Sequence, residues 1–175
     1  MASKQRMITA VFRDRLNADA AWNWLTAHGY GVNEINMLMS ENTKAKYYNR
    51  ESEGAIGTSS HAAEGLAAGG AIGTAVGATA AAIAAIGTSI LIPGLGIVVA
   101  GPLAAALAGA GAGAVTGGII GGLIGLGIPE SNARAYEEVL RDGGVVIGVA
   151  PHNANDAADI KERFEELKGE NIITV

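Results

Sequence analysis

The sequence predicts an α+β protein whose folded head is divided in two by an inserted glycine-zipper α-helical hairpin. Three observations lead to this fold class. Apolar, β-branched runs and helices with apolar residues at helical spacing follow one another in the order βαβ at the N-terminal end and αβαβ at the C-terminal end. Residues 65–129 contain no Asp, Glu, Lys, Arg or His. Within this uncharged section, small residues recur at every fourth position.

Residues 1–39 are expected to form the first half of the head. Residues 7–12 are rich in apolar and β-branched side chains and predict a strand. Asn17 is suited to cap a helix over residues 18–28, which Gly29 would end. Residues 32–39 predict a second strand, and alternate positions of it place Ile35, Met37 and Met39 on one face. Residues 40–64 are polar and predict a linker with a short helix.

Residues 129–175 are expected to form the second half. Pro129 suits the first turn of a helix that runs to Leu140. Residues 145–149 predict a strand, Asn155 a helix cap, and residues 172–175 the final strand. The second helix has apolar side chains at helical spacing: Ala157, Ile160, Phe164 and Leu167.

A faint repeat relates the two halves. Asp19 and Asp156 are each followed by two alanines, and Ile35 and Ile172 each follow the aspartate by sixteen residues. Two such halves predict a discontinuous ferredoxin-like head (βαβ + αβαβ) with its helices on one face of the sheet.

Residues 65–128 are expected to be the glycine-zipper hydrophobic helical hairpin. Residues four apart lie along one face of a helix, and a row of small ones lets another backbone approach closely. The predicted helix-packing residues form two rows, Gly65, Gly69, Gly73 and Gly77, then Gly101, Gly109, Gly113, Gly117, Gly121 and Gly125. The predicted hairpin turn between helices near 65–90 and 103–128 contains Pro93, Gly94, Gly96 and Pro102.

Each predicted arm exceeds the roughly 20 residues that cross a bilayer. The basic residues Lys44, Lys46 and Arg50 precede the arms, and Arg134 and Arg141 follow them. The positive-inside tendency therefore favours a bacterial cytoplasmic membrane protein with its head and both termini in the cytoplasm and the turn translocated. No apolar signal core precedes Met7, so we expect no cleaved leader.

The predicted turn is more apolar than the arm that leads to it. Five large apolar side chains in the first arm supply only about 1.5–3 kcal/mol of insertion free energy. A tip in water should be polar, yet this one contains Ile90, Leu91, Ile92, Leu95, Ile97, Val98 and Val99. Either the hairpin is re-entrant, or its tip is buried among copies of the chain in a cytoplasmic assembly.

Several segments resemble bacterial heat-induced general stress proteins of the YflT type and related glycine-zipper membrane proteins. They are residues 92–96, 100–109, 125–130, 135–138 and 143–149, so the similarity covers roughly residues 90–150. The resemblance implies a stress-associated, membrane-linked protein without an assigned enzymatic activity.

The residues indicate no enzyme, and we predict no catalytic, cofactor-binding or metal-binding residues. Cysteine is absent, and the net charge of −5 does not favour nucleic acid. His61 with Glu51, Glu53 and Glu64 is better explained as solvated linker than as a metal site. His28 suits a helix C-terminus, and one of Trp22 and Trp24 is expected in the core.

The leading hypothesis is a non-enzymatic, stress-associated membrane protein that self-assembles through its glycine-zipper hairpin. Its predicted partners are the lipid bilayer and other copies of the chain, with no nucleic acid and no small-molecule substrate. The alternatives are a soluble particle or filament with the apolar hairpins packed inside, and an oligomeric pore. Polar side chains are scarce along the arms, where the threonines are Thr74, Thr79, Thr88 and Thr116, and this scarcity argues against a wet lumen.

Overall fold

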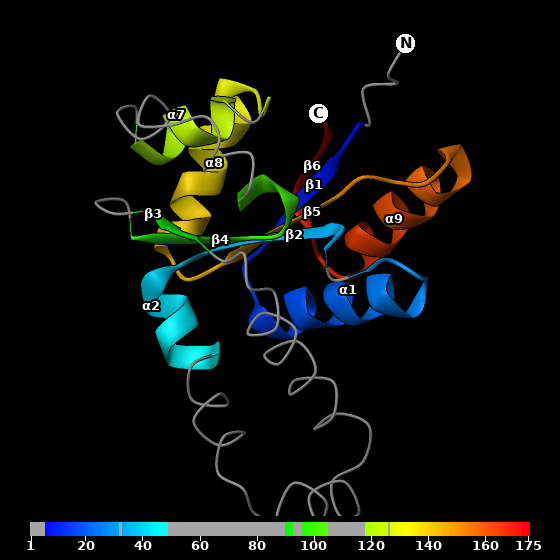
Figure 1. Ribbon diagram of the computed structural model, residues 1–175, viewed down its shortest axis with the longest axis horizontal. Coiled ribbons are helices and arrows are strands. Elements are labelled where there is room, and N and C mark those ends of the chain that lie inside the picture. Colours follow the sequence, from blue (N-terminus) through cyan, green and yellow to red (C-terminus); the bar gives the residue numbers. More distant parts are fainter. Residues whose placement is uncertain (1–5, 32, 49–89, 93–95, 105–117, 126) are drawn as a thin grey trace, which may run out of the picture.

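The computed structural model describes residues 6–31, 33–48, 90–92, 96–104, 118–125 and 127–175. These residues form an antiparallel sheet with the strand order β3-β4-β2-β5-β1-β6, and helices lie against both of its faces (Figure 1). The predicted α+β class is therefore confirmed.

The elements follow the chain in this order: β1 (Ile8–Phe12), α1 (Arg15–Ala27), β2 (Ile35–Ser40), α2 (Glu41–Thr43), the π-helix η1 (Lys44–Tyr48), β3 (Ile90–Ile92), β4 (Ile97–Ala100), α7 (Gly118–Gly125), α8 (Glu130–Arg141), β5 (Val145–Val149), α9 (Ala154–Glu166) and β6 (Glu170–Thr174).

The helix of the first half begins earlier than the sequence predicts. Asp14, not Asn17, is its N-cap: the Asp14 carboxylate accepts a hydrogen bond from the Leu16 amide at 2.9 Å. Asn17 lies inside the first turn. Because Asp14 follows β1 by only two residues and has extended backbone angles, it can serve as the cap directly after the strand. The expected single face of Ile35, Met37 and Met39 is confirmed, since all three belong to one core.

The second half follows the predicted order with shifted caps. Pro129 is the N-cap of α8 and not part of its first turn. Asn153, not Asn155, caps α9, and its side-chain oxygen accepts from the Asn155 and Asp156 amides at 2.9 and 3.0 Å. The predicted strand at 145–149 and the inward positions Ile160 and Phe164 are confirmed.

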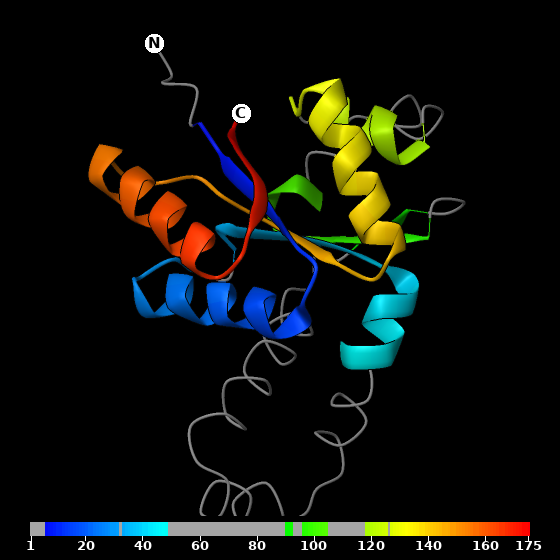
Figure 2. The ribbon, with the colours of Figure 1, turned by 180° about the vertical axis from the view of Figure 1, so that it is seen from behind.

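The expectation that the helices share one face of the sheet is wrong. Helices α1 and α9 cover one face, where Phe12, Trp22 and Phe164 lie in the core. Helices α7 and α8 cover the opposite face, as the reverse view shows (Figure 2). Helix α8 lies there because its apolar stripe packs on the residues of β1 and β5 that point away from α1. That stripe consists of Ala133, Tyr136, Val139 and Leu140.

Candidate functional site: the uncharged section docked on the head

The centre of the uncharged section belongs to the sheet. Ile90–Ile92 and Ile97–Ala100 are antiparallel strands, and β4 pairs with β2 from Met37↔Ala100 to Ser40↔Ile97. The expectation that residues 93–102 join two helices is therefore wrong, as is a first arm that stays helical to residue 90. Because both flanks and these strands share one sheet, the apolar tip is not carried away from the head.

Burial on both faces explains why this segment is so apolar. Ile97 and Val99 pack with the core under α7 and α8, while Val98 and Ala100 pack with the core under α1. All four side chains are at most 4% exposed. A strand covered on both faces has a continuous apolar sequence in place of an alternating one. The short β-branched run bounded by glycines was the available signal for a strand.

A buried asparagine fixes the end of β4 to the head. The Asn36 side-chain oxygen accepts from the Leu103 amide at 2.7 Å, and its nitrogen donates to the Gly148 carbonyl at 3.2 Å. Gly101 lies beside Asn36 and has φ +93°. A Cβ at this position would collide with the backbone of Ile35 and with Asn36. Gly101 is thus a close-approach residue after a strand and not a member of a helical row.

The turn between β3 and β4 also contacts the head. The Gly96 carbonyl accepts from the Glu41 amide, the first amide of α2, at 2.7 Å. Gly96 has φ +61°, a conformation that favours glycine. Asn36 and Glu41 therefore hold opposite ends of this β-hairpin.

The last part of the uncharged section forms α7, which packs on α8 and the sheet. Ile119 and Leu123 are buried in that core. The other side of α7 is apolar but open: Ile124 is 43% exposed, and a Cβ at Gly121 or Gly125 would meet no atom within 4 Å among the residues described. These two glycines of the predicted second row, Gly121 half-buried and Gly125 exposed, therefore lie on an apolar helix side with open space beside it.

The remaining predicted packing and turn residues lie outside the described residues: Gly65, Gly69, Gly73, Gly77, Gly109, Gly113, Gly117, Pro93 and Gly94. Pro102 begins a short helical turn directly after Gly101. Among the helices that the structure describes, none combines the length and the apolar character needed to cross a bilayer.

A polar cluster at the same end of the sheet as Asn36 joins the two halves. The Tyr30 ring stacks on His152, and its hydroxyl donates to the Asp156 carboxylate at 3.0 Å. His152 Nε2 lies 3.0 Å from a Glu34 carboxylate oxygen. The other carboxylate oxygen of Glu34 accepts from the Gly31 amide at 2.7 Å. This hydrogen bond is the main cause that lowers the pKa of Glu34, and the hydrogen bond with His152 is the second.

Sequence reasoning missed this cluster and the role of Asn36. The signal for Asn36 was a lone amide in the apolar run of β2, whereas no spacing relates residues 30–34 to 152–156. The described residues bring together no group of three metal-ligating side chains. His28 caps the end of α1 and stacks on Trp24, while Trp22 is buried.

Comparison with known proteins found no matching family model, no matching curated protein and no matching solved structure.

Proposed function

We propose that this protein is a non-enzymatic, self-associating protein that works at a membrane, with the uncharged section as its association surface and the α+β head as its anchor. The observation that carries the proposal is that the head binds the centre and the end of the uncharged section and leaves one apolar helix face open. The section is paired to β2 at its centre and packed on α8 at its end, and α7 leaves an apolar, glycine-containing face open.

We propose that the head is ferredoxin-like. The strands of the two halves are adjacent in the order β2-β5-β1-β6, all antiparallel, with α1 between β1 and β2 and α9 between β5 and β6. This is the order in which a βαββαβ chain places its four strands. In this interpretation β3, β4 and α7 are additions made by the inserted section.

The ends of the inserted section favour association from one side of a bilayer. A segment that crosses the membrane once has its two ends on opposite sides. The segment between η1 and β3 starts and ends at the same head, so a single crossing does not fit it. The 13 residues between 104 and 118 are also fewer than the roughly 20 needed to cross the hydrocarbon. We therefore prefer the re-entrant arrangement over a translocated turn.

The biological setting that we propose is the stress response. Its support is the resemblance of residues 90–150 to YflT-type stress proteins. Of the resembling segments of this chain, residues 135–138 lie in α8, and residues 143–149 include β5. A soluble particle with the apolar surfaces inside is the second candidate, because the open face of α7 would suit a second copy of the chain as well as lipid.

Flotation and size measurement of the untagged chain test the proposal. We expect the chain to float with vesicles of phosphatidylethanolamine and phosphatidylglycerol, and to form oligomers in detergent. A defined particle that stays in the high-speed supernatant without detergent, and that does not float, would establish the soluble assembly instead.

A matched pair of variants tests the glycine row itself. Gly73→Leu adds a side chain on the row, whereas Ala71→Leu adds the same side chain two positions away, on the opposite side of a helix. Both raise the apolar character of the segment. We expect only Gly73→Leu to weaken self-association, by at least about tenfold, because the row requires close backbone approach. Equal effects would show that the row is not a packing surface.

A further inference from the structure

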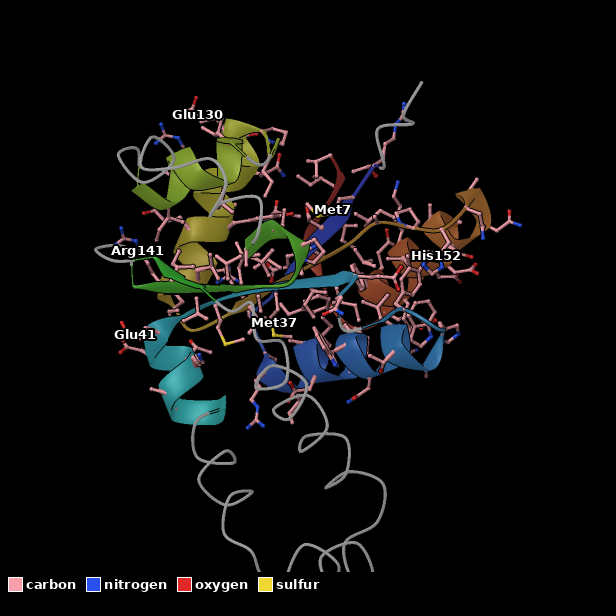
Figure 3. All side chains as sticks on the ribbon, in the orientation of Figure 1. Met7, Met37, Glu41, Glu130, Arg141 and His152 are labelled. Atoms are coloured by element: carbon pink, nitrogen blue, oxygen red, sulfur yellow. The ribbon has the colours of Figure 1, made fainter. Side chains whose placement is uncertain are left out.

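We propose that an open groove in the head, at the end of the sheet opposite His152, binds a phosphate ester that carries hydroxyl groups. The groove has a volume of about 610 Å³, within the range of small-molecule sites. It lies where β1 and β2 end and where α8 turns into β5. Figure 3 shows Arg141 and Glu41 at this end and His152 at the other. The inference concerns the head alone and does not rest on membrane association.

Cations from three separate segments line the groove. Arg13 and Arg15 follow β1, Lys46 lies in η1, and Arg141 is the last residue of α8. The turn after Arg141 lies close to α2, since a Cβ at Gly143 would be 3.7 Å from the Thr43 hydroxyl oxygen. The fold therefore brings together basic side chains that are more than 120 residues apart in sequence.

Two of the guanidinium groups are oriented but keep donors for a ligand. Arg13 donates through Nε to both carboxylate oxygens of Glu170, at 3.1 Å each, and Arg141 donates through Nε and Nη2 to one oxygen of Glu137, at 3.1 and 2.7 Å. Neither terminal nitrogen of Arg13, nor Nη1 of Arg141, has a hydrogen bond within the described residues. Both side chains are at least half exposed. Donors held in this way suit the bidentate recognition of phosphate.

The acidic lining determines which anion fits. Asp142 is 64% exposed, and its carboxylate lies 3.8 Å from Arg13 Nη1. Asp14 also lines the groove but caps α1. With Glu137 and Glu170 beside the arginines, the net field on a bare anion is small, so hydroxyl groups that donate to Asp142 should add to the binding of a phosphate.

The hydroxyl side chains complete the polar lining. Ser40 and Thr43 are hydrogen-bonded to each other at 2.8 Å, and the Thr43 amide donates to Ser40 Oγ at 3.1 Å. Glycerol phosphate has the chemistry that this lining would recognise: a phosphate for the arginines and hydroxyls for Asp142 and the Ser40–Thr43 pair. It occurs both as a free ester and as the headgroup of phosphatidylglycerol.

Equilibrium dialysis of the full chain with labelled glycerol 3-phosphate tests the proposal. We expect saturable binding of one molecule per chain, tighter than that of inorganic phosphate. Arg13→Gln and Arg141→Gln should each weaken it about tenfold, the loss expected for a charge-assisted hydrogen bond.

Arg134→Gln is the matched control. Arg134 lies on the same helix as Arg141, is similarly exposed at 66% against 69%, and has the same kind of pair, with Glu130 at 2.6 Å. It lies outside the groove. Lack of saturable binding, or equal weakening by Arg134→Gln in chains with unchanged circular dichroism, would overturn the proposal.

Co-sedimentation with vesicles distinguishes the two sources of the ester. Phosphatidylglycerol vesicles that bind the chain through Arg141 and release it with glycerol 3-phosphate would assign the groove to the lipid headgroup. If Arg141→Gln leaves vesicle binding unchanged, the groove takes the free ester. Phosphatidylcholine vesicles control for adsorption through the apolar section.

Discussion

The buried hydroxyl of Tyr136 links three distant parts of the chain, and this arrangement makes its chemistry measurable. The hydroxyl donates to the Asn171 carbonyl at 2.7 Å and lies 3.0 Å from the Thr9 hydroxyl oxygen. Burial raises the pKa of Tyr136 to about 12, although the Thr9 hydrogen bond opposes the shift. The un-ionised form is thus favoured by folding, so its contribution is complete below about pH 10 and is lost as the pH rises towards 12.

Tyr136→Phe should lower the free energy of unfolding at pH 7 by about 1–2 kcal/mol, because the Asn171 carbonyl and the Thr9 hydroxyl lose a partner. The variant should also remove the part of the loss of stability at alkaline pH that ionisation of Tyr136 causes. Urea unfolding between pH 7 and pH 11.5 measures both effects. A variant that keeps the full alkaline loss would show that other groups govern it.

The carboxylate of Glu34 makes the opposite prediction at acid pH. Its pKa is lowered by the Gly31 amide and then by His152, so its contribution to stability is present above the ordinary value of about 4.5 and is lost as the pH falls below it. Glu34→Gln should lower the melting temperature at pH 7 and have a smaller effect at pH 3. Glu138→Gln, at an exposed position of α8, is the control. An equal effect at both pH values would contradict this account.

Among the elements, β4 depends on the residue that follows it. Gly101→Ala should destabilise the protein by about 2 kcal/mol or more, because the new Cβ meets the backbone of Ile35 and the side chain of Asn36 in addition to the strain of a positive φ. Gly29→Ala isolates the strain alone: Gly29 has φ +89° with nothing within 4 Å. Thermal unfolding of both variants should give the larger loss for Gly101→Ala, and the reverse order would refute the close approach.

The elements also show what the sequence could predict. Helices α1, α8 and α9 were predicted from the helical spacing of apolar residues, because each has one apolar side that faces a core. Strands β1, β2 and β5 were predicted from runs of apolar and β-branched residues, although these strands are buried on both faces. The caps were misplaced by a few residues, since several Asn and Asp side chains compete for each helix start. Strands β3 and β4 were missed because the prolines and glycines around them, Pro93, Gly94, Gly101 and Pro102, favour a turn between two helices. Asn36 and the Tyr30–His152 cluster acquire their partners only through tertiary contacts.

Helix α7 allows a test of the second glycine row within the described residues. Gly121→Leu places a strong helix former at an open helical position, so we expect the melting temperature of the head to rise by a few degrees. If the open face of α7 is an association surface, the same variant should weaken self-association at least about fivefold in light scattering. Unchanged association would separate α7 from that surface.

At the scale of the whole molecule, the head is built from both ends of the chain together with the centre of the insertion. Strand β5 lies between β1 and β2, so neither half can form the sheet without the other. Strand β4 then extends the sheet beyond β2, and the core beneath α8 includes Ile97 and Val99. The boundary between head and insertion is therefore not a single point. Strands β3 and β4, residues 101–104, helix α7 and Ile128 belong to the head, although their composition resembles the rest of the uncharged section.

This division predicts that part of the insertion can be changed without unfolding the head. Replacement of residues 65–85 by a Gly/Ser sequence of the same length keeps η1, β3, β4 and α7 and their connections. We expect the circular dichroism of the sheet and cooperative unfolding of the head to persist, whereas vesicle flotation and self-association are lost. Replacement of residues 90–100 is the control. It removes β3 and β4, leaves β2 as an unpaired edge and takes Ile97 and Val99 out of the core that contains Leu38, so we expect it to abolish cooperative unfolding. If replacement of 65–85 also unfolds the head, the first glycine row belongs to the core; if flotation persists, α7 and its neighbours are sufficient for membrane binding.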